Sequence, residues 1–159
     1  MTTAAIVTLV VRYGLVLLFL PFSALDKIFG FDHAVKQAQS VFEPRPIAIT
    51  MILIGLFVEV ICSLGVVTGI ADRACAFVIA GYCAATAALY KQFWAQGDFW
   101  SDPSGKGRTL LWDFLKNLSL GAGFLLIVIG TDGTGLAPFL HAPFASSHPY
   151  GVRHDRSSR

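Results

Sequence analysis

The sequence predicts an all-α integral membrane protein, folded as an antiparallel bundle of four transmembrane helices. Of its 159 residues, 55% are hydrophobic and only 14% are charged, whereas a soluble domain carries about 25% charged residues. This apolar excess is too large for the core of one soluble domain of this length. Four apolar runs also have the length needed to cross a bilayer, about 17–25 residues. Because lipid offers no hydrogen-bond partner to open backbone, each run is expected to form a continuous helix.

The four predicted helices span residues 4–25, 48–68, 74–90 and 110–130. The first is longer than the apolar core of a signal peptide, about 7–15 residues, and we interpret it as a retained helix that Pro21 bends near its end. In the third, small residues recur every four positions, which predicts close approach of a neighbouring helix. These small residues are Ala80, Ala84 and Ala88 in one series and Gly81 and Ala85 in another.

The segments outside the helices differ in character. The four helices are expected to form one domain over residues 1–130, with a short amphipathic helix at residues 35–41 that the following "EPRP" ends. Residues 131–159 are rich in Gly, Pro and Ser and are predicted to be an irregular, mostly disordered tail. Four helices place both termini on one side of the membrane. The tight turn "GIADR" and the arginine-rich tail favour the cytoplasm for that side.

Several classes of function find no support in the sequence. The net charge of +2 comes from scattered basic residues, so no nucleic acid is expected as a partner. Cys62, Cys75 and Cys83 form no CxxC and fall in apolar runs, which favours packing over redox chemistry. The segment "HAPFASSH" carries no cysteine or carboxylate at ligand spacing, so no metal site is predicted. No Ser, His and Asp arrangement indicates hydrolysis, and we predict no catalytic residue.

Charged residues inside the predicted helices are the candidates for a functional site. At 1.5 Å per residue, Arg12 lies about 12 Å from the side that holds the termini. Glu59 lies about 16 Å from the other side of a core about 30 Å thick. A charge at this depth costs roughly 2.5–3.5 kcal/mol on the insertion scale, so each requires a partner. Since a guanidinium matches a carboxylate, we predict an Arg12–Glu59 ion pair inside the bundle.

A second group of polar residues lies nearer the side opposite the termini. Lys116 is about 9 Å and Asp113 about 5 Å from that surface, and Lys27 lies at the end of the first helix on the same side. Lys116 and Asn117 are expected to extend the central pair into a network. Two purely structural interpretations stay open. The buried ion pair can serve helix register alone, and Asp113 with a snorkelling Lys116 can be an ordinary helix start. Intramembrane ionisable residues are nevertheless functional candidates by default.

Four stretches in order resemble the DoxX family of small bacterial membrane proteins. They are "RYGLVLLFLPFSALDKIFGF" (12–31), "GLFVEVICSLGVVTGIADR" (55–73), "YKQFW" (90–94) and "FLKNLSLGAGFLLIV" (114–128). The resemblance implies a four-helix membrane bundle. It carries over as polar positions of the family Arg12, Lys27, Glu59, Lys116 and Asn117.

One departure from the family pattern is Lys91, where many members have a histidine. This departure puts a histidine-dependent contact with a proton or a quinone in doubt for this chain. The family's name comes from a subunit associated with a thiosulfate:quinone oxidoreductase. The resemblance therefore implies an accessory subunit of a quinone-linked or oxidant-defence assembly in the bacterial inner membrane.

The expected ligand is a quinone, held without a covalent bond by Arg12, Lys116 and Asn117, with Glu59 setting the charge balance. A quinone carbonyl accepts hydrogen bonds that these three side chains donate. The expected partners are the lipid bilayer, other redox subunits that carry the electrons, and further copies of the chain. Two alternatives remain: a small proton-linked transporter that uses the polar column as its path, and a scaffold without a ligand whose charges fix helix register.

Overall fold

The computed structural model describes residues 2–130 and 135–151. Within these ranges the chain is helical and contains no strand. Four stretches are long and apolar enough to cross a membrane: Thr3–Phe29, Arg45–Thr68, Asp72–Ala95 and Lys106–Ile129. Each covers most or all of one predicted helix, so the prediction of an all-α membrane protein with four spans is confirmed.

The first two spans are each built from three consecutive helical pieces. The first comprises α1 (Thr3–Val16), the π-helical turn η1 (Leu18–Ser23) and α2 (Ala24–Phe29). The second comprises α4 (Arg45–Phe57), the π-helical turn η2 (Val58–Cys62) and α5 (Ser63–Thr68). The short helix α3 (Phe31–Gln39) connects them. It begins four residues before the predicted amphipathic helix and packs its small apolar face on α4.

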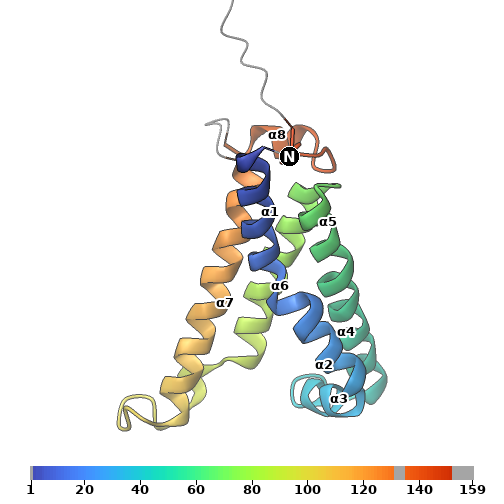
Figure 1. The fold of residues 1–159 in the computed structure, drawn as a ribbon. Coiled ribbons are helices and arrows are strands. Elements are labelled where there is room, and N and C mark those ends of the chain that lie inside the picture. Colours follow the sequence, from blue (N-terminus) through green and yellow to red (C-terminus); the bar gives the residue numbers. More distant parts are fainter. Residues whose placement is uncertain (1, 131–134, 152–159) are drawn as a thin grey trace, which may run out of the picture.

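The last two spans are α6 (Asp72–Tyr90) and α7 (Lys106–Ile129). The loop between them contains the short 3₁₀ helix η3 (Phe93–Ala95), and α8 (Ala137–His141) follows α7. Figure 1 shows that the spans converge at the end that holds the N-terminus and α8 and diverge toward the other end. We call the two diverging parts the α2–α4 leg, which includes α3, and the α6–α7 leg.

The first span is not the continuous helix that the sequence predicts. Leu20 has φ −123° and ψ 113°, which is extended backbone inside η1, and Pro21 follows it. Proline lacks the N–H of a helical hydrogen bond and its ring clashes with the preceding turn, so the predicted bend at Pro21 is present and sharper than expected. In the second span, η2 keeps the helix continuous but contains Glu59 in a wider turn. Single π-helical turns of this kind are frequent at functional sites.

The core lies where the spans converge, and apolar side chains also cover the outside. Phe124 and Ile79 are almost fully buried there, and Gly121 brings α7 against α6, since a Cβ on it would lie 3.4 Å from the Ala80 carbonyl oxygen. The predicted close packing is therefore correct for Ala80. It is wrong for the other four small residues, because they are exposed: Gly81, Ala84, Ala85 and Ala88. The face of α6 that packs inward instead carries Ala76, Ala80, Cys83 and Ala87.

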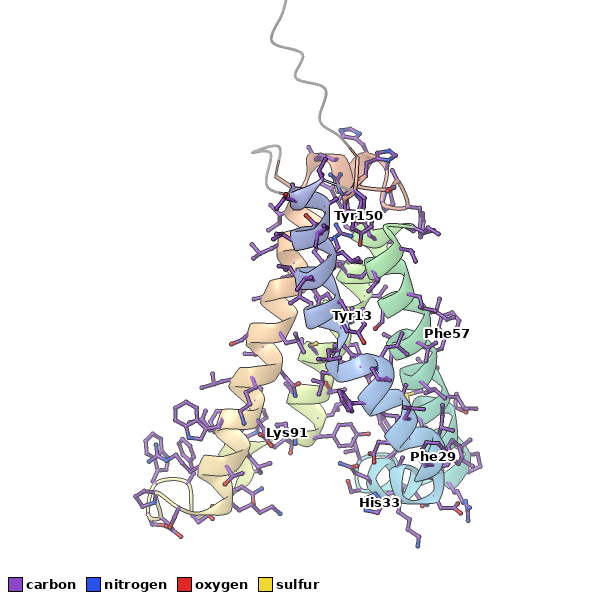
Figure 2. All side chains as sticks on the ribbon, viewed as in Figure 1. Tyr13, Phe29, His33, Phe57, Lys91 and Tyr150 are labelled. Carbon is purple, nitrogen blue, oxygen red and sulfur yellow. The ribbon has the colours of Figure 1, made fainter. Side chains whose placement is uncertain are left out.

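The described part of the tail, residues 135–151, is mostly irregular, but it contains one short helix and packs on the bundle. In residues 135–151, α8 packs on α6 through Phe139, whose ring centroid lies 5.2 Å from that of Phe77. Tyr150, labelled in Figure 2, donates a hydrogen bond to the Val67 carbonyl at the end near α8. Burial raises the pKa of Tyr150. Hydrogen bonds and aromatic contacts therefore hold this part of the tail on the bundle; residues 131–134 and 152–159 lie outside the described residues.

Candidate functional site

Arg12 belongs to a buried cluster near the end that holds the N-terminus. Its Nη1 donates to Asp72 Oδ2 at 2.6 Å and to the Val66 carbonyl oxygen at 2.8 Å. Its Nη2 donates to Ser147 Oγ at 3.0 Å. Ser147 in turn donates its backbone N–H to Asp72 Oδ1 at 2.9 Å and its hydroxyl to Asp72 Oδ2. Arg12 is 7% exposed and Asp72 is fully buried, and both Asp72 oxygens have donors.

The predicted Arg12–Glu59 ion pair is wrong. Every Cα–Cβ bond of a helix tilts toward the helix N-terminus. α1 and α4 run in opposite directions, so Arg12 tilts toward the end that holds the termini while Glu59 tilts toward the other end. Depth along the axis brought the two residues together in the prediction, but side-chain direction separates them. Arg12 reaches Asp72 at the start of α6 instead.

Glu59 belongs to a second buried cluster, on the α2–α4 side. Its Oε1 accepts hydrogen bonds from Lys27 Nζ at 2.7 Å, Tyr82 OH at 2.8 Å and Ser23 Oγ at 3.0 Å. Lys27 Nζ also donates to Ser23 Oγ at 2.7 Å. Glu59 is 1% exposed, yet its Oε2 is buried without a hydrogen-bond partner among the described residues. Such a buried, unpartnered acceptor is uncommon and requires an explanation.

Local backbone geometry positions this second cluster. Ser23 ends η1 and Lys27 follows one helical turn later in α2, so the two side chains lie on one face. Glu59 lies in η2 and Tyr82 in α6. Gly55, one turn before Glu59, leaves room for the tyrosine, because a Cβ at Gly55 would lie 3.0 Å from the Tyr82 hydroxyl oxygen.

A third, more exposed cluster joins the α6 and α7 helices. Asp113 Oδ2 accepts from Lys91 Nζ at 3.1 Å, and Asp113 Oδ1 accepts from Lys116 Nζ at 3.5 Å. The Lys116 side chain is 75% exposed. The expectation that Lys116 extends the central network is therefore wrong, because its ammonium group is exposed and pairs with Asp113 outside the bundle interior.

A cavity of about 530 Å³ lies between the two legs. Figure 2 shows Lys91 on the α6–α7 leg and His33 on the opposite leg. The apolar wall of the cavity includes Met51, Ile52, Ile54 and Leu89. Its polar wall consists of Ser23, Asp26, Lys27, His33, Gln37, Tyr82, Thr86, Tyr90, Lys91 and Asn117.

The cavity separates the predicted site residues into two groups. Lys27 and Asn117 line it, and Glu59 lies behind its wall through Ser23, Lys27 and Tyr82. Asp113 is likewise not part of the wall, but it pairs with Lys91, which is. Arg12 and Lys116 are not part of the cavity wall.

Sequence reasoning missed Asp72, Ser147 and Tyr82, and it treated Lys91 only as a departure from the family pattern. Asp72 gave a usable signal, since it is an acid at the start of the third span, on the side toward which the Arg12 side chain tilts. Tyr82 and Ser147 gave none, because a tyrosine in an apolar helix and a serine in a polar tail are common.

The comparison with protein families agrees with this architecture. The DoxX family model matches residues 7–92, which is more than half of the chain and includes Arg12, Lys27, Glu59, Asp72 and Lys91. No curated protein and no solved structure gives a significant match. The matched range and the four apolar spans lead to one conclusion: the chain is a multi-pass membrane protein that belongs to the DoxX family.

Proposed function

We propose that the protein is an accessory subunit of a redox assembly in the bacterial inner membrane and binds a quinone in the cavity between its two legs. The observation that carries this proposal is an amphipathic cavity of about 530 Å³ whose wall is formed by all four membrane-spanning stretches together with α3. Pockets for small molecules typically measure about 300–1,000 Å³ and combine apolar walls with a few placed polar groups.

A quinone suits this cavity because its head is a neutral acceptor of hydrogen bonds and its tail is hydrocarbon. The Lys27 ammonium has three N–H donors, of which Ser23 and Glu59 take two. The third is available to a carbonyl in the cavity, as is the amide of Asn117. Lys27 thus takes the contacting role that the sequence assigned to Arg12 and Lys116, while Asn117 keeps its contacting role and Glu59 its role of balancing charge.

The cavity accounts for binding of the quinone, but electron transfer to or from the quinone requires a redox group. In this proposal the electron-carrying group belongs to a partner subunit, and the DoxX chain holds or delivers the quinone. The Glu59 cluster then orients Lys27 toward the head group, since two of the three Lys27 donors are anchored before the ligand arrives. Such preorganisation lowers the entropic cost of binding.

Native mass spectrometry of the protein, gently extracted from its own membrane, tests the proposal by detecting a retained quinone and redox subunits at fixed stoichiometry. A matched pair of variants sharpens the test. Ala85 lines the cavity, whereas its neighbour Ala84 lines a separate groove between α6 and α7. We expect Ala85→Phe to lose the quinone and Ala84→Phe to retain it. A bare homo-oligomer of the wild-type chain, without quinone or redox subunit, would contradict the proposal and favour transport assays.

A further inference from the structure

Two lysines face the same cavity from opposite legs. Lys27 comes from α2 and Lys91 directly follows α6, and both line the cavity. Their legs diverge in Figure 1, and the cavity occupies the space between them. A molecule that fills the cavity therefore meets an ammonium group on each side.

Each of the two lysines is already paired with a carboxylate outside the cavity wall. Lys27 Nζ lies 2.7 Å from Glu59 Oε1, and Lys91 Nζ lies 3.1 Å from Asp113 Oδ2. Asp26 adds a third carboxylate on the wall itself. Lys116 also pairs with Asp113. The three lysines are thus matched by three carboxylates. The cavity therefore presents no net positive charge to attract an anion.

Each lysine nevertheless keeps hydrogen-bond donors free for a ligand. An ammonium group has three N–H donors. Lys27 uses two of them, on Ser23 and Glu59. Lys91 donates to Asp113, which leaves donors that can turn toward the cavity. A paired lysine that still donates suits a neutral acceptor, because binding such an acceptor does not require the ion pair to break.

We infer that Lys27 and Lys91 bind the two ends of the head group, and that the cavity selects a neutral ligand with acceptors at both ends over an anionic amphiphile. A ring with carbonyl oxygens at opposite positions has this chemistry. Lys27 and Lys91 are binding residues, whereas Glu59 and Asp113 are positioning residues that act through them. This inference rests on the proposed function and names the residues and the selectivity of its site.

Lys116 provides the control that separates binding from structure. Lys91 and Lys116 both pair with Asp113, but only Lys91 lines the cavity. Removing either lysine takes one cation from the same carboxylate. A loss of ligand affinity in Lys91→Met but not in Lys116→Met therefore reports contact with the ligand and not disruption of the Asp113 cluster.

The test measures equilibrium binding to the full chain in lipid nanodiscs. The ligands are a short-tailed 1,4-benzoquinone and, separately, decanoate as an anionic amphiphile of similar size. We expect Lys27→Met and Lys91→Met each to weaken quinone binding about tenfold, the loss of one charge-assisted hydrogen bond. Lys116→Met should stay within about twofold of the wild type. The wild type should bind decanoate at least about tenfold more weakly than the quinone.

Circular dichroism and thermal unfolding show whether each variant is folded. Because Lys27→Met leaves Glu59 without its cation, the double variant Lys27→Met with Glu59→Gln is measured beside it, and the quinone should bind that variant equally weakly. If the wild type binds the quinone and the Lys91→Met and Lys116→Met affinities are equal, the two-lysine assignment is wrong while the proposed function stands. Tight decanoate binding overturns the selectivity. No quinone binding to the wild type overturns both proposals.

Discussion

Among the described residues, the two buried ion pairs Arg12–Asp72 and Lys27–Glu59 differ in how fully their carboxylate oxygens are hydrogen-bonded. In the Arg12 cluster, both oxygens of Asp72 accept hydrogen bonds, and Arg12 bonds to a carboxylate, a carbonyl and a hydroxyl. In the Glu59 cluster, three donors converge on Oε1 and none on Oε2. Both ion pairs are buried and come from membrane-spanning helices, so burial alone does not distinguish the two clusters.

The difference shows which cluster has an acceptor that the described residues leave without a donor. The Arg12 cluster ties α1, α5, α6 and the tail together and is enclosed by protein, so we assign it to structure. The Glu59 cluster reaches the cavity wall through Ser23, Lys27 and Tyr82, so we assign it to ligand binding. Breaking each cluster should therefore change a different measurable property.

The largest expected effect is on stability, from Arg12→Leu. This variant leaves Asp72 as a buried carboxylate without its cation, which typically costs about 3–5 kcal/mol. The free energy of unfolding in mixed micelles measures it. Replacing both Arg12 and Asp72 with leucine should restore a large part of the loss, because no buried charge is then stranded. As a control, Arg45→Gln removes an exposed pair with Asp32 and should cost no more than about 1 kcal/mol.

A smaller loss of stability is expected for Ser147→Ala. The Ser147 hydroxyl accepts from Arg12 and donates to Asp72, and hydrogen bonds to charged groups contribute about 1.5–3 kcal/mol. Its neighbour provides the control, since among the described residues the Ser146 hydroxyl bonds to the His148 backbone N–H, within the tail. Equal unfolding free energies for Ser147→Ala and Ser146→Ala would show that the Ser147 hydroxyl does not stabilise the Arg12 cluster.

Tyr82→Phe should affect the Glu59 cluster with little loss of stability. It removes one of the three donors to Glu59 Oε1, and since Lys27 and Ser23 still donate to that oxygen, the loss should lie near the lower end of the range of about 1.5–3 kcal/mol that a hydrogen bond to a charged group contributes. Quinone affinity should fall as well, since Tyr82 lines the cavity. Tyr13→Phe changes a half-exposed tyrosine that is not part of the cavity wall and is the control. An unchanged affinity in Tyr82→Phe would place the ligand away from this wall.

The smallest effects are expected from two glycine substitutions that should change the melting temperature in opposite directions. Alanine in place of a helical glycine stabilises by roughly 0.5–1 kcal/mol where space is free. A Cβ at Gly81 meets nothing within 4 Å, whereas a Cβ at Gly55 lies 3.0 Å from the Tyr82 hydroxyl oxygen. Gly81→Ala should thus raise the melting temperature slightly, and Gly55→Ala should lower both the melting temperature and quinone affinity by displacing Tyr82. A melting temperature that rises in both variants would show that Tyr82 adapts freely to a Cβ at residue 55.

The fold was predictable because it depends on hydrophobic length. Four apolar runs of the right length, separated by polar links, permit little else in a bilayer. The break at Leu20 was only partly predictable: Pro21 indicates a bend, but the extended backbone before it depends on packing against η2.

The candidate site was harder to predict because rise per residue gives depth but no direction. Arg12 and Glu59 lie at similar depths and still turn apart, since their helices are antiparallel and each side chain tilts toward its own N-terminus. The same tilt turns Lys27 back from the end of α2 toward Glu59. The role of Ser147 depends on a long-range contact between the tail and the bundle, which no local pattern encodes.

The most direct test of the division between the two clusters is one paired measurement of quinone affinity in lipid nanodiscs. It compares Glu59→Gln with the paired Arg12→Leu and Asp72→Leu variant, each corrected for its folded fraction. We predict that Glu59→Gln weakens binding about tenfold, because Lys27 loses the carboxylate that orients it, while the paired variant binds as the wild type does. Unchanged affinity in Glu59→Gln, or an equal loss in both variants, would contradict the assignment of Glu59 to function and Arg12 to structure.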